Sequence, residues 1–353
     1  MVSSIRLQNF RSYSDASFEF EPGVNIIIGP NGSGKTNLLE AILVICSGNS
    51  YRARDLELIQ FDKPWARLDG QFEKHVRILK LVKDAKTTQK SFELDDKLFK
   101  RLSLERTVPV VLFEPNHLQL ITRGPQQRRD YFDDILERTQ SGFRALNARY
   151  RRTLAQRNAL LKQGPARAAQ QLFAWDVRLS QLGAQIVTAR LALLDDINAA
   201  ISQTYSQISG KTSQVELRYE TPINTKNYSS RLLSKLEAST EADFGRGFTG
   251  HGPHHEDIAI NLNNQPASTT ASRGEMRSLL LALKIFELKL LENARGQKPL
   301  FLLDDVFSEL DGARRKHLVR HLKGYQTIIT TTDAEAVLEY FSKNTHLVPL
   351  LKE

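Results

Sequence analysis

The chain has 353 residues, which is long enough for two domains with hydrophobic cores of their own. Its 49 lysines and arginines against 40 acidic residues leave a formal net charge of +9, which favours a polyanionic partner. A single cysteine, Cys46, excludes an intrachain disulfide, and the sequence lacks both the roughly 20-residue apolar run of a membrane span and a secretory signal, so we expect a cytoplasmic protein.

Strand patterns dominate the first 113 residues. Alternating apolar residues within 5–20 predict an antiparallel pair of strands. Val24–Ile28 is short and largely apolar, which is typical of a buried parallel strand. A helix is predicted from Lys35 onward. Residues 66–98 again have the pattern of strands joined by polar turns, and 109–113 (PVVLF) form another apolar strand.

Residues 126–207 are rich in Ala, Leu, Gln and Arg and nearly free of strand signals. Apolar residues recur there at steps of three, four or seven, which predicts amphipathic helices, and Gly164 with Pro165 should break the helix. We therefore predict two long helices folded back on each other at Gly164. The apolar stripes should form the hairpin's own seam; a coiled coil with a partner is the alternative. The stripes are Phe143, Leu146, Tyr150, Leu154 and Leu161, then Leu172, Trp175, Leu179, Leu182, Ile186, Ala189 and Leu193.

The last third of the chain returns to alternating strands and helices. Its predicted elements are strands at 215–219, 257–262, 300–303 and 327–330, and helices at 274–291 and 313–322. The fold class is therefore α/β with a mixed sheet, interrupted by a mainly helical second lobe (a helical hairpin). We expect residues 1–115 to be the first part of the α/β lobe, 116–240 a basic helical lobe, and 241–353 the second part of the α/β lobe.

A glycine-rich segment between the apolar strand and the helix matches the phosphate-loop pattern G-x-x-x-x-G-K-T at every fixed position. Glycines allow backbone N–H groups to face phosphates, and the helix N-terminus adds partial positive charge. Lys35 is expected to reach the β- and γ-phosphates, and the Thr36 hydroxyl to bind Mg²⁺. ATP and Mg²⁺ are therefore the predicted cofactors, and a glycine-rich turn without a ligand is the alternative. The loop consists of Gly29, Pro30, Asn31, Gly32, Ser33, Gly34, Lys35 and Thr36.

The apolar strand at 300–303 delivers two acids, Asp304 and Asp305, to the carboxyl edge of the sheet, where α/β folds bind ligands. Asp304 is expected to hold Mg²⁺. Asp305 stands where ABC-type ATPases usually carry a glutamate that polarises the attacking water. Because aspartate is one methylene shorter, we expect slow hydrolysis, with Asp305, Asp304 and Lys35 as the catalytic residues. The alternative is a capping acid pair after a buried strand.

A short polar stretch before the long helix at 274–291 has the pattern of an ABC signature. Ser272 is predicted as the N-cap with Glu275 at capping-box spacing, which is a complete structural explanation by itself. The order of an S-x-G-E stretch, a helix, an apolar strand and an acid pair is nevertheless that of ABC ATPases, in which one subunit's signature covers another's γ-phosphate. We therefore expect the α/β lobe, residues 1–115 and 241–353, to be an ABC-type ATPase head with a mixed sheet and a phosphate loop. The predicted signature residues are Ser272, Arg273, Gly274 and Glu275.

Further positions follow from the same motif order. Asp311 lies where such proteins carry the D-loop, and Thr331 or Thr332 would have to replace the common switch histidine. Asp311 and Thr331 are therefore candidate nucleotide contacts. Glu114 occupies the place of the glutamine loop without being a glutamine. The segment 251–257 (HGPHHED) invites a metal-site hypothesis, but no matching cysteine or histidine set accompanies it.

Residues 141–194 carry nine basic residues and one acid, Asp176, an excess of eight positive charges. A solvated helix surface would mix charges of both signs, so we predict contacts with DNA phosphates rather than base readout. The candidates for DNA contact are Arg144, Arg149, Arg151, Arg152 and Arg157, and the other basic residues are Lys162, Arg167, Arg178 and Arg190.

Six segments together resemble the RecF family over essentially the whole chain: LQNFRSY, GPNGSGKTNLLEAI, RGPQQRRDYFDD, TGHGPHHEDI, SRGEMR and LLDDVFSELD. RecF is similar in its head to SMC proteins but lacks their long coiled coil. The resemblance implies an ATP-dependent recombination mediator that binds gapped, single- and double-stranded DNA and dimerises on ATP. It also implies that the protein acts with RecO and RecR to load RecA and is linked to replication and SOS induction. The resemblance further implies a weak DNA-stimulated ATPase activity that acts as a switch.

Three other ATPase classes share these motifs. In a transporter ATPase subunit the loop and the signature lie closer together than Lys35 and Ser272 do here, and a glutamine loop is expected. A structural SMC-type head would need an insertion of hundreds of heptad residues. An ATPase of a phage-defence system has the same head, although the segment HGPHHEDI counts against it.

Overall fold

The structure, a computed structural model, describes residues 1–353 apart from 74, 85–86, 334, 342–344 and 351–353. Side chains at 167–170, 308 and 336 are not described either, so the basic side chain of Arg167 lies outside the described residues. The contacts within the chain divide it into two compact units. The first unit comprises 1–117, 207–210 and 283–353, and the second comprises 118–206 and 211–282.

One sheet of the first unit is antiparallel and six-stranded, with the strand order β2-β1-β4-β5-β6-β7. The predicted antiparallel pair within 5–20 is confirmed, since Ile5 pairs with Phe18. The strands are β1 (Val2–Phe10), β2 (Tyr13–Glu19), β4 (Trp65–Phe72), β5 (His75–Lys83), β6 (Thr88–Leu94) and β7 (Lys97–Phe99).

The second sheet of this unit is five-stranded, with the order β14-β3-β13-β12-β8 and parallel neighbours throughout. The strands predicted as one mixed sheet are therefore divided between an antiparallel and a parallel sheet. Four of its strands are short and largely buried, as is typical of a parallel sheet: β3 (Val24–Ile28), β8 (Val110–Phe113), β12 (Leu300–Asp304) and β13 (Thr327–Thr331). The fifth, β14 (Thr345–Pro349), lies at the edge of the sheet and is only partly buried.

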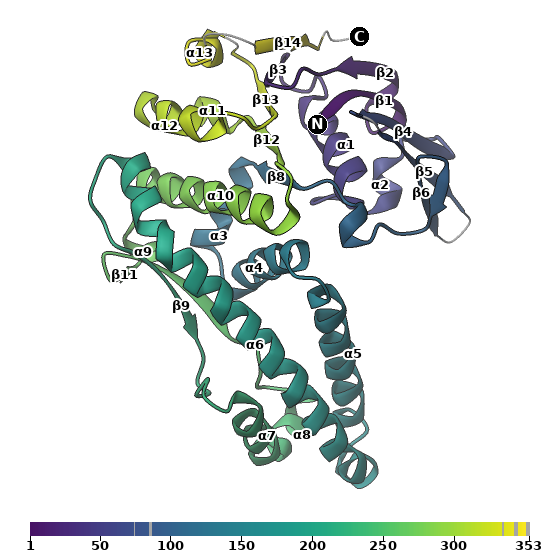
Figure 1. The fold of residues 1–353 in the computed structure, drawn as a ribbon. Coiled ribbons are helices and arrows are strands. Elements are labelled where there is room, and N and C mark those ends of the chain that lie inside the picture. Colours follow the sequence, from purple (N-terminus) through teal and green to yellow (C-terminus); the bar gives the residue numbers. More distant parts are fainter. Residues whose placement is uncertain (74, 85–86, 334, 342–344, 351–353) are drawn as a thin grey trace. The chain divides into compact units, whose positions relative to one another are not determined.

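The predicted helix after the phosphate loop is α1 (Lys35–Ser47), and it contacts strands of both sheets (Figure 1). Its apolar residues join those of the two sheets in one hydrophobic core. Cys46 belongs to this core, and burial raises the pKa of its thiol to about 12. The other helices of this unit are α2 (Asp55–Leu58), α11 (Val306–Glu309), α12 (Gly312–Leu322) and α13 (Glu335–Leu338), and α10 (Arg273–Arg295) belongs to both units.

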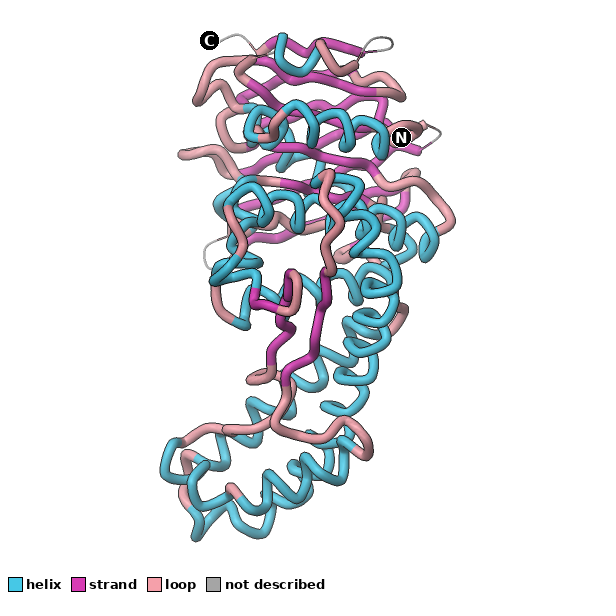
Figure 2. Tube along the Cα trace, turned by 90° about the vertical axis from the view of Figure 1, so that its left-hand side faces the viewer, coloured by secondary structure: helices cyan, strands magenta, loops and turns pink. Residues whose placement is uncertain are grey.

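The second unit is mainly helical and contains one small antiparallel sheet, in the order β11-β10-β9 (Figure 2). None of the helices that the structure describes is both long and apolar enough to cross a membrane. The elements are α3 (Gln119–Thr122), α4 (Pro125–Thr139), α5 (Phe143–Leu161), α6 (Pro165–Ser209), α7 (Tyr228–Ala238), α8 (Thr240–Arg246) and α9 (Ala267–Thr270), with β9 (Val215–Glu220), β10 (Asp257–Leu262) and β11 (Gln265–Pro266).

The predicted break at Gly164 is confirmed, since α5 ends at Leu161, α6 begins at Pro165, and Gly164 has φ +83°. The prediction of a single long helix before this break is wrong, however, because α4 and α5 occupy that segment. Gly142, with φ +86°, separates α4 from α5 and leaves α5 with only 19 residues against 45 in α6. The stripe residues that are buried within the chain, as expected of a hairpin's own seam, include Phe143, Tyr150, Leu161, Leu172, Leu179, Leu182, Ile186 and Leu193.

The second unit ends at Ala282, whereas the sequence predicted the end of the helical lobe at residue 240. Residues 241–282 group with the helices because β10 pairs with β9 along six residues. An ion pair from Arg157 to Asp243 also holds this segment. These partners are distant in sequence, so a change in composition could not reveal the boundary.

Candidate functional site

The segment Gly29–Thr36 links β3 to α1 and needs its glycines. Gly32 and Gly34 have φ of +82° and +96°, which L side chains rarely adopt. A Cβ atom at Gly34 would lie 2.7 Å from the Tyr13 hydroxyl, and one at Gly29 would lie 2.9 Å from the carbonyl oxygen of Leu350. Gly34 is also the N-cap of α1, so the loop runs directly into a helix N-terminus.

Lys35 is buried against its own loop. Its Nζ donates to the carbonyl oxygens of Gly29 at 2.8 Å and Pro30 at 3.1 Å. The Ser33 hydroxyl is buried and has no hydrogen-bond partner among the described residues. A buried ammonium, an unpaired hydroxyl and a helix N-terminus within one loop suit an anionic ligand such as a phosphate group.

Two predicted metal ligands meet beside this loop. The Thr36 hydroxyl donates to Asp304 Oδ1 at 3.0 Å, although 268 positions separate the two residues. The Thr330 hydroxyl donates to the same oxygen at 2.8 Å, because β13 and β12 are parallel neighbours with Thr330 beside Asp304. Hydroxyl and carboxylate oxygens are ligands that Mg²⁺ prefers, so this donor set fits the predicted metal.

Asp305 follows Asp304 with φ +52° and is the N-cap of α11. This left-handed conformation turns the chain at the strand end, and the backbone N–H of Asp305 donates to the Thr330 hydroxyl at 2.9 Å. Burial raises the pKa of the Asp305 carboxyl, Lys35 counteracts this effect, and Asp304 adds to it. The carboxylate therefore lies within the electrostatic reach of the phosphate-loop lysine.

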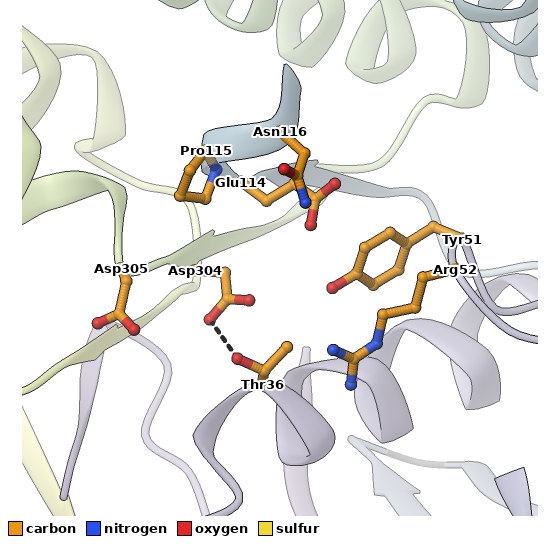
Figure 3. Close-up of a pocket in the computed structure, with 8 residues that line it drawn as sticks. All are labelled: Thr36, Tyr51, Arg52, Glu114, Pro115, Asn116, Asp304 and Asp305. Carbon is orange, nitrogen blue, oxygen red and sulfur yellow. Dashed lines mark hydrogen bonds between the residues drawn. The ribbon is translucent and has the colours of Figure 1, made fainter. Parts of the chain in front are cut away.

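A cavity of about 370 Å³ opens in front of Thr36 and Asp304 (Figure 3). Glu114 follows β8 and lies beside Asp304, since Phe113 and Leu303 are partners in the sheet. Burial and then Asp304 raise the pKa of the Glu114 carboxyl. The residues that line the cavity are Thr36, Tyr51, Arg52, Glu114, Pro115, Asn116, Asp304 and Asp305.

Sequence reasoning missed four residues of this site: Thr330, Tyr51, Arg52 and Asn116. Arg52 and Tyr51 come from the loop after α1, where no motif points to a ligand. The switch prediction at Thr331 stays a prediction. Its buried hydroxyl exchanges hydrogen bonds with the backbone of Asp333, both at 3.0 Å, while the preceding threonine reaches Asp304.

The signature residues belong to the second unit, where they begin α10. The capping box is confirmed: Ser272 N donates to Glu275 Oε2 at 2.9 Å, and Glu275 N donates to Ser272 Oγ at 3.3 Å. Asp311 caps α12 by accepting from the backbone of Arg314 at 3.0 Å. These bonds account for the local structure, and the contacts of these residues with a nucleotide stay predictions.

The model of the RecF/RecN/SMC N terminal domain family matches residues 1–348. The DNA replication and repair protein RecF of Heliobacterium modesticaldum is 34% identical over 348 residues, which cover 95% of this chain and 93% of that protein. The protein of the same name from Roseiflexus castenholzii is 33% identical over 369 residues, covering 95% and 94%. The chain belongs to the RecF family.

Solved structures agree with this assignment. Two are described as the recombination mediator protein RecF, with ATPrS and with ATP, and have TM-scores of 0.86 and 0.83 at 30% and 29% identity. The matches cover 96% and 94% of this chain and 94% and 92% of those chains. An Smc head bound to a domain of ScpA has a TM-score of 0.54 at 17% identity, covering 96% of this chain and 91% of that one. This likeness shows the predicted ABC-type head fold.

The basic stretch of this RecF-family chain divides into two classes. Arg157 is fully buried and donates to Asp176, to Asp243 at 2.7 Å and to Thr249 at 2.9 Å. The prediction that it contacts DNA is therefore wrong. Arg190 is likewise buried against Asp133. The basic side chains on α5 that remain exposed are those of Arg144, Arg149, Arg151 and Arg152.

The segment 251–257 is structural in this RecF-family chain. No group of three or more His, Cys, Asp or Glu side chains among the described residues could hold a metal ion. His254 instead hydrogen-bonds the Tyr150 hydroxyl at 2.7 Å, and burial lowers the pKa of its imidazole to about 4. Glu256 accepts from the hydroxyls of Tyr228 and Thr221, both at 2.6 Å. Sequence alone could not separate this buried network from a metal site.

Proposed function

We propose that this chain is an ATP-dependent, DNA-binding recombination mediator that acts in DNA repair, in gap repair, replication restart and SOS induction. The observation that carries the proposal is the hydrogen bond between Thr36 and Asp304 beside a glycine-dependent phosphate loop. Similarity to RecF proteins along almost the whole chain supports the DNA-repair part. ATP serves as a switch rather than as a metabolic substrate.

Each group around the cavity has a part in binding the nucleotide. Lys35 would leave its backbone carbonyl partners and donate to the β- and γ-phosphates, because phosphate oxygens carry more negative charge. Thr36 and Asp304 would hold Mg²⁺, which neutralises charge on the phosphates when bound. Asp305 would orient the attacking water, with the slow turnover expected of its short side chain.

ATP would also bring two copies of the chain together. Ser272, Arg273 and Gly274, with Glu275 behind them, would close over the γ-phosphate held by the partner's loop, and Asp311 would lie in the same interface. The capping box supports this arrangement, because it fixes the start of α10 and leaves further backbone N–H groups at a helix N-terminus for an anion.

DNA would be held by the exposed arginines of α5, which meet phosphates without reading bases. Replacing Arg149, Arg151 and Arg152 with Glu should lower the slope of log affinity against log salt by about 0.9 for each duplex phosphate that the protein no longer neutralises. The matched control reverses three exposed charges of the same unit, Lys226, Arg231 and Lys235, and should bind like wild type. If both variants weaken binding equally, α5 is not the DNA surface.

The function itself is tested by measuring the chain's mass with and without ATP, Mg²⁺ and gapped DNA, and then RecA assembly on that DNA with RecO and RecR. The proposal expects an ATP-dependent dimer that accelerates RecA assembly only when both partner proteins are present. A chain that dimerises on ATP but has no effect on RecA would support the defence-system alternative. A chain whose mass is the same with and without ATP would contradict the proposal that ATP acts as a switch for dimerisation.

A further inference from the structure

Thr330 lies near the carboxyl end of β13, the strand between β3, which leads into the phosphate loop, and β12, which carries the acid pair. It is fully buried, and its partners in the sheet are Ile27 on β3 and Asp304 on β12. Pairing on both sides fixes the backbone of this residue. A threonine side chain is also stiff, because its branched Cβ restricts rotation about χ1. The parallel sheet therefore holds the Thr330 hydroxyl in one place beside Asp304.

The Thr330 hydroxyl has a single proton and directs it to Asp304. Its Oγ1 lies 2.8 Å from Asp304 Oδ1 and 3.4 Å from the carbonyl oxygen of Leu303. The carboxylate is both the closer and the stronger acceptor, so it receives the proton. A lone pair of the same Oγ1 accepts the backbone N–H of Asp305 at 2.9 Å. One buried hydroxyl therefore connects the carboxylate of the first acid to the backbone of the second.

The backbone of Asp305 adopts a left-handed conformation, with φ +52°. Such a conformation costs a residue other than glycine on the order of 1–3 kcal/mol, and it persists only where the surrounding structure holds it. The hydrogen bond from the Asp305 N–H to Thr330 is one contact that does so. In Figure 3 the carboxylates of the acid pair lie apart, and that of Asp304 is beside Thr36. Their separation matters because two like charges close together disfavour ionisation of both.

Asp304 Oδ1 accepts hydrogen bonds from two hydroxyls, and the two have different positions in the fold. Thr36 lines the nucleotide cavity and is itself an expected ligand of Mg²⁺. Thr330 belongs to the same sheet as Asp304 and is not among the residues that line the cavity. It can therefore orient the Asp304 carboxylate without binding the metal or the nucleotide. Residues that hold a metal ligand in this way contribute substantially to metal affinity.

We propose that Thr330 is the positioning residue of the acid pair: its hydroxyl orients the Asp304 carboxylate toward Mg²⁺ and holds the backbone turn that places Asp305 for the attacking water. Without this hydroxyl, the Asp304 carboxylate would keep only the bond from Thr36 and could rotate, and the Asp305 N–H would lose its acceptor. Metal binding and the geometry of the acid pair should therefore weaken together. The inference rests on the proposed ATPase function, because it assigns a third residue to the same site.

The effect on Asp304 is tested by titrating ATP binding with Mg²⁺. Thr330→Val keeps the shape of the side chain but removes the hydroxyl, so the Mg²⁺ concentration for half-maximal ATP binding should rise about 10- to 100-fold. Thr330→Ser should restore the wild-type requirement. Thr327→Val makes the same exchange at another buried threonine of β13 and is the matched control. A wild-type Mg²⁺ requirement in folded Thr330→Val would overturn the proposal for Asp304. ATP binding by the wild type that ignores Mg²⁺ would instead refute the metal site of the proposed function.

The effect on Asp305 is tested by hydrogen exchange of its amide in the absence of nucleotide and metal. In Thr330→Val this amide should exchange about 2- to 13-fold faster, the loss expected of one ordinary hydrogen bond, and Thr330→Ser should exchange like wild type. Thr330→Cys, whose thiol is a weaker donor and acceptor, should give intermediate values in both measurements and remains informative if Thr330→Val fails to fold. Wild-type exchange in folded Thr330→Val, or in Thr330→Cys if only that variant folds, would overturn the link between Thr330 and Asp305.

Discussion

Replacing Arg157 with Met separates a structural arginine from a DNA-binding one. The guanidinium is fully buried and forms ion pairs with Asp176 on α6 and Asp243 on α8. Methionine would fill the space of the arginine but would leave these buried carboxylates without their cation. Removing one partner of a buried pair costs about 3–5 kcal/mol. For a unit of this size, that corresponds to a fall in melting midpoint of roughly 6–20 °C. Asp243 keeps its ion pair with Arg246 at 2.8 Å, so the unpaired Asp176 carboxylate should account for most of the lost stability.

The loss of stability in Arg157→Met should depend on pH. Burial already raises the pKa of Asp176, and Arg157 opposes that rise. In the variant the folded-state pKa rises further above the unfolded value, so stability is retained at low pH and lost as pH rises through the folded pKa. The deficit in melting midpoint should therefore be larger at pH 7 than at pH 4. Melting followed by circular dichroism tests this, with the exposed Arg149→Met on the same helix as the control. A variant that melts like wild type but binds DNA weakly would refute the structural role.

Three further variants test the nucleotide site. Asp305→Asn should keep ATP binding but reduce phosphate release to background, and persistent wild-type release would mean that another group orients the water. Ser272→Arg should bind ATP as a monomer, so an unchanged ATP-dependent increase in mass would contradict the cross-subunit signature. Glu114→Gln removes a carboxylate beside Asp304, and titration calorimetry should then show a several-fold higher Mg²⁺ requirement for ATP binding; an unchanged requirement would exclude a role for this charge.

The sequence predicts the phosphate loop and the acid pair well because both are local motifs whose chemistry depends on adjacent residues. Glycines with φ above +80° and a lysine bonded to its own loop can be expected from GPNGSGKT alone. The contact between Thr36 and Asp304 joins residues far apart in sequence, yet it follows from the rule that parallel strands deliver ligands to one edge. Both predictions rest on geometry that any such sheet imposes.

Other features depend on partners that no local pattern reveals. Arg157 looks like its exposed neighbours Arg151 and Arg152 in sequence, and only Asp176 and Asp243, 19 and 86 positions away, identify it as buried. The choice between adjacent threonines on β13 also depends on strand register, because successive side chains face opposite sides of a sheet. Sequence composition therefore predicts the basic helix but not which of its arginines face solvent.

The binding of labelled ATP to Lys35→Ala in the presence of Mg²⁺ tests the central claim most directly. Lys97→Ala, an exposed lysine of the same unit, serves as the control and should bind like wild type. Lys35 is the phosphate-loop cation that would face the β- and γ-phosphates, so its loss should abolish measurable binding while the melting midpoint stays near that of wild type. Tight ATP binding by Lys35→Ala would contradict the assignment of Gly29–Thr36 as the nucleotide site.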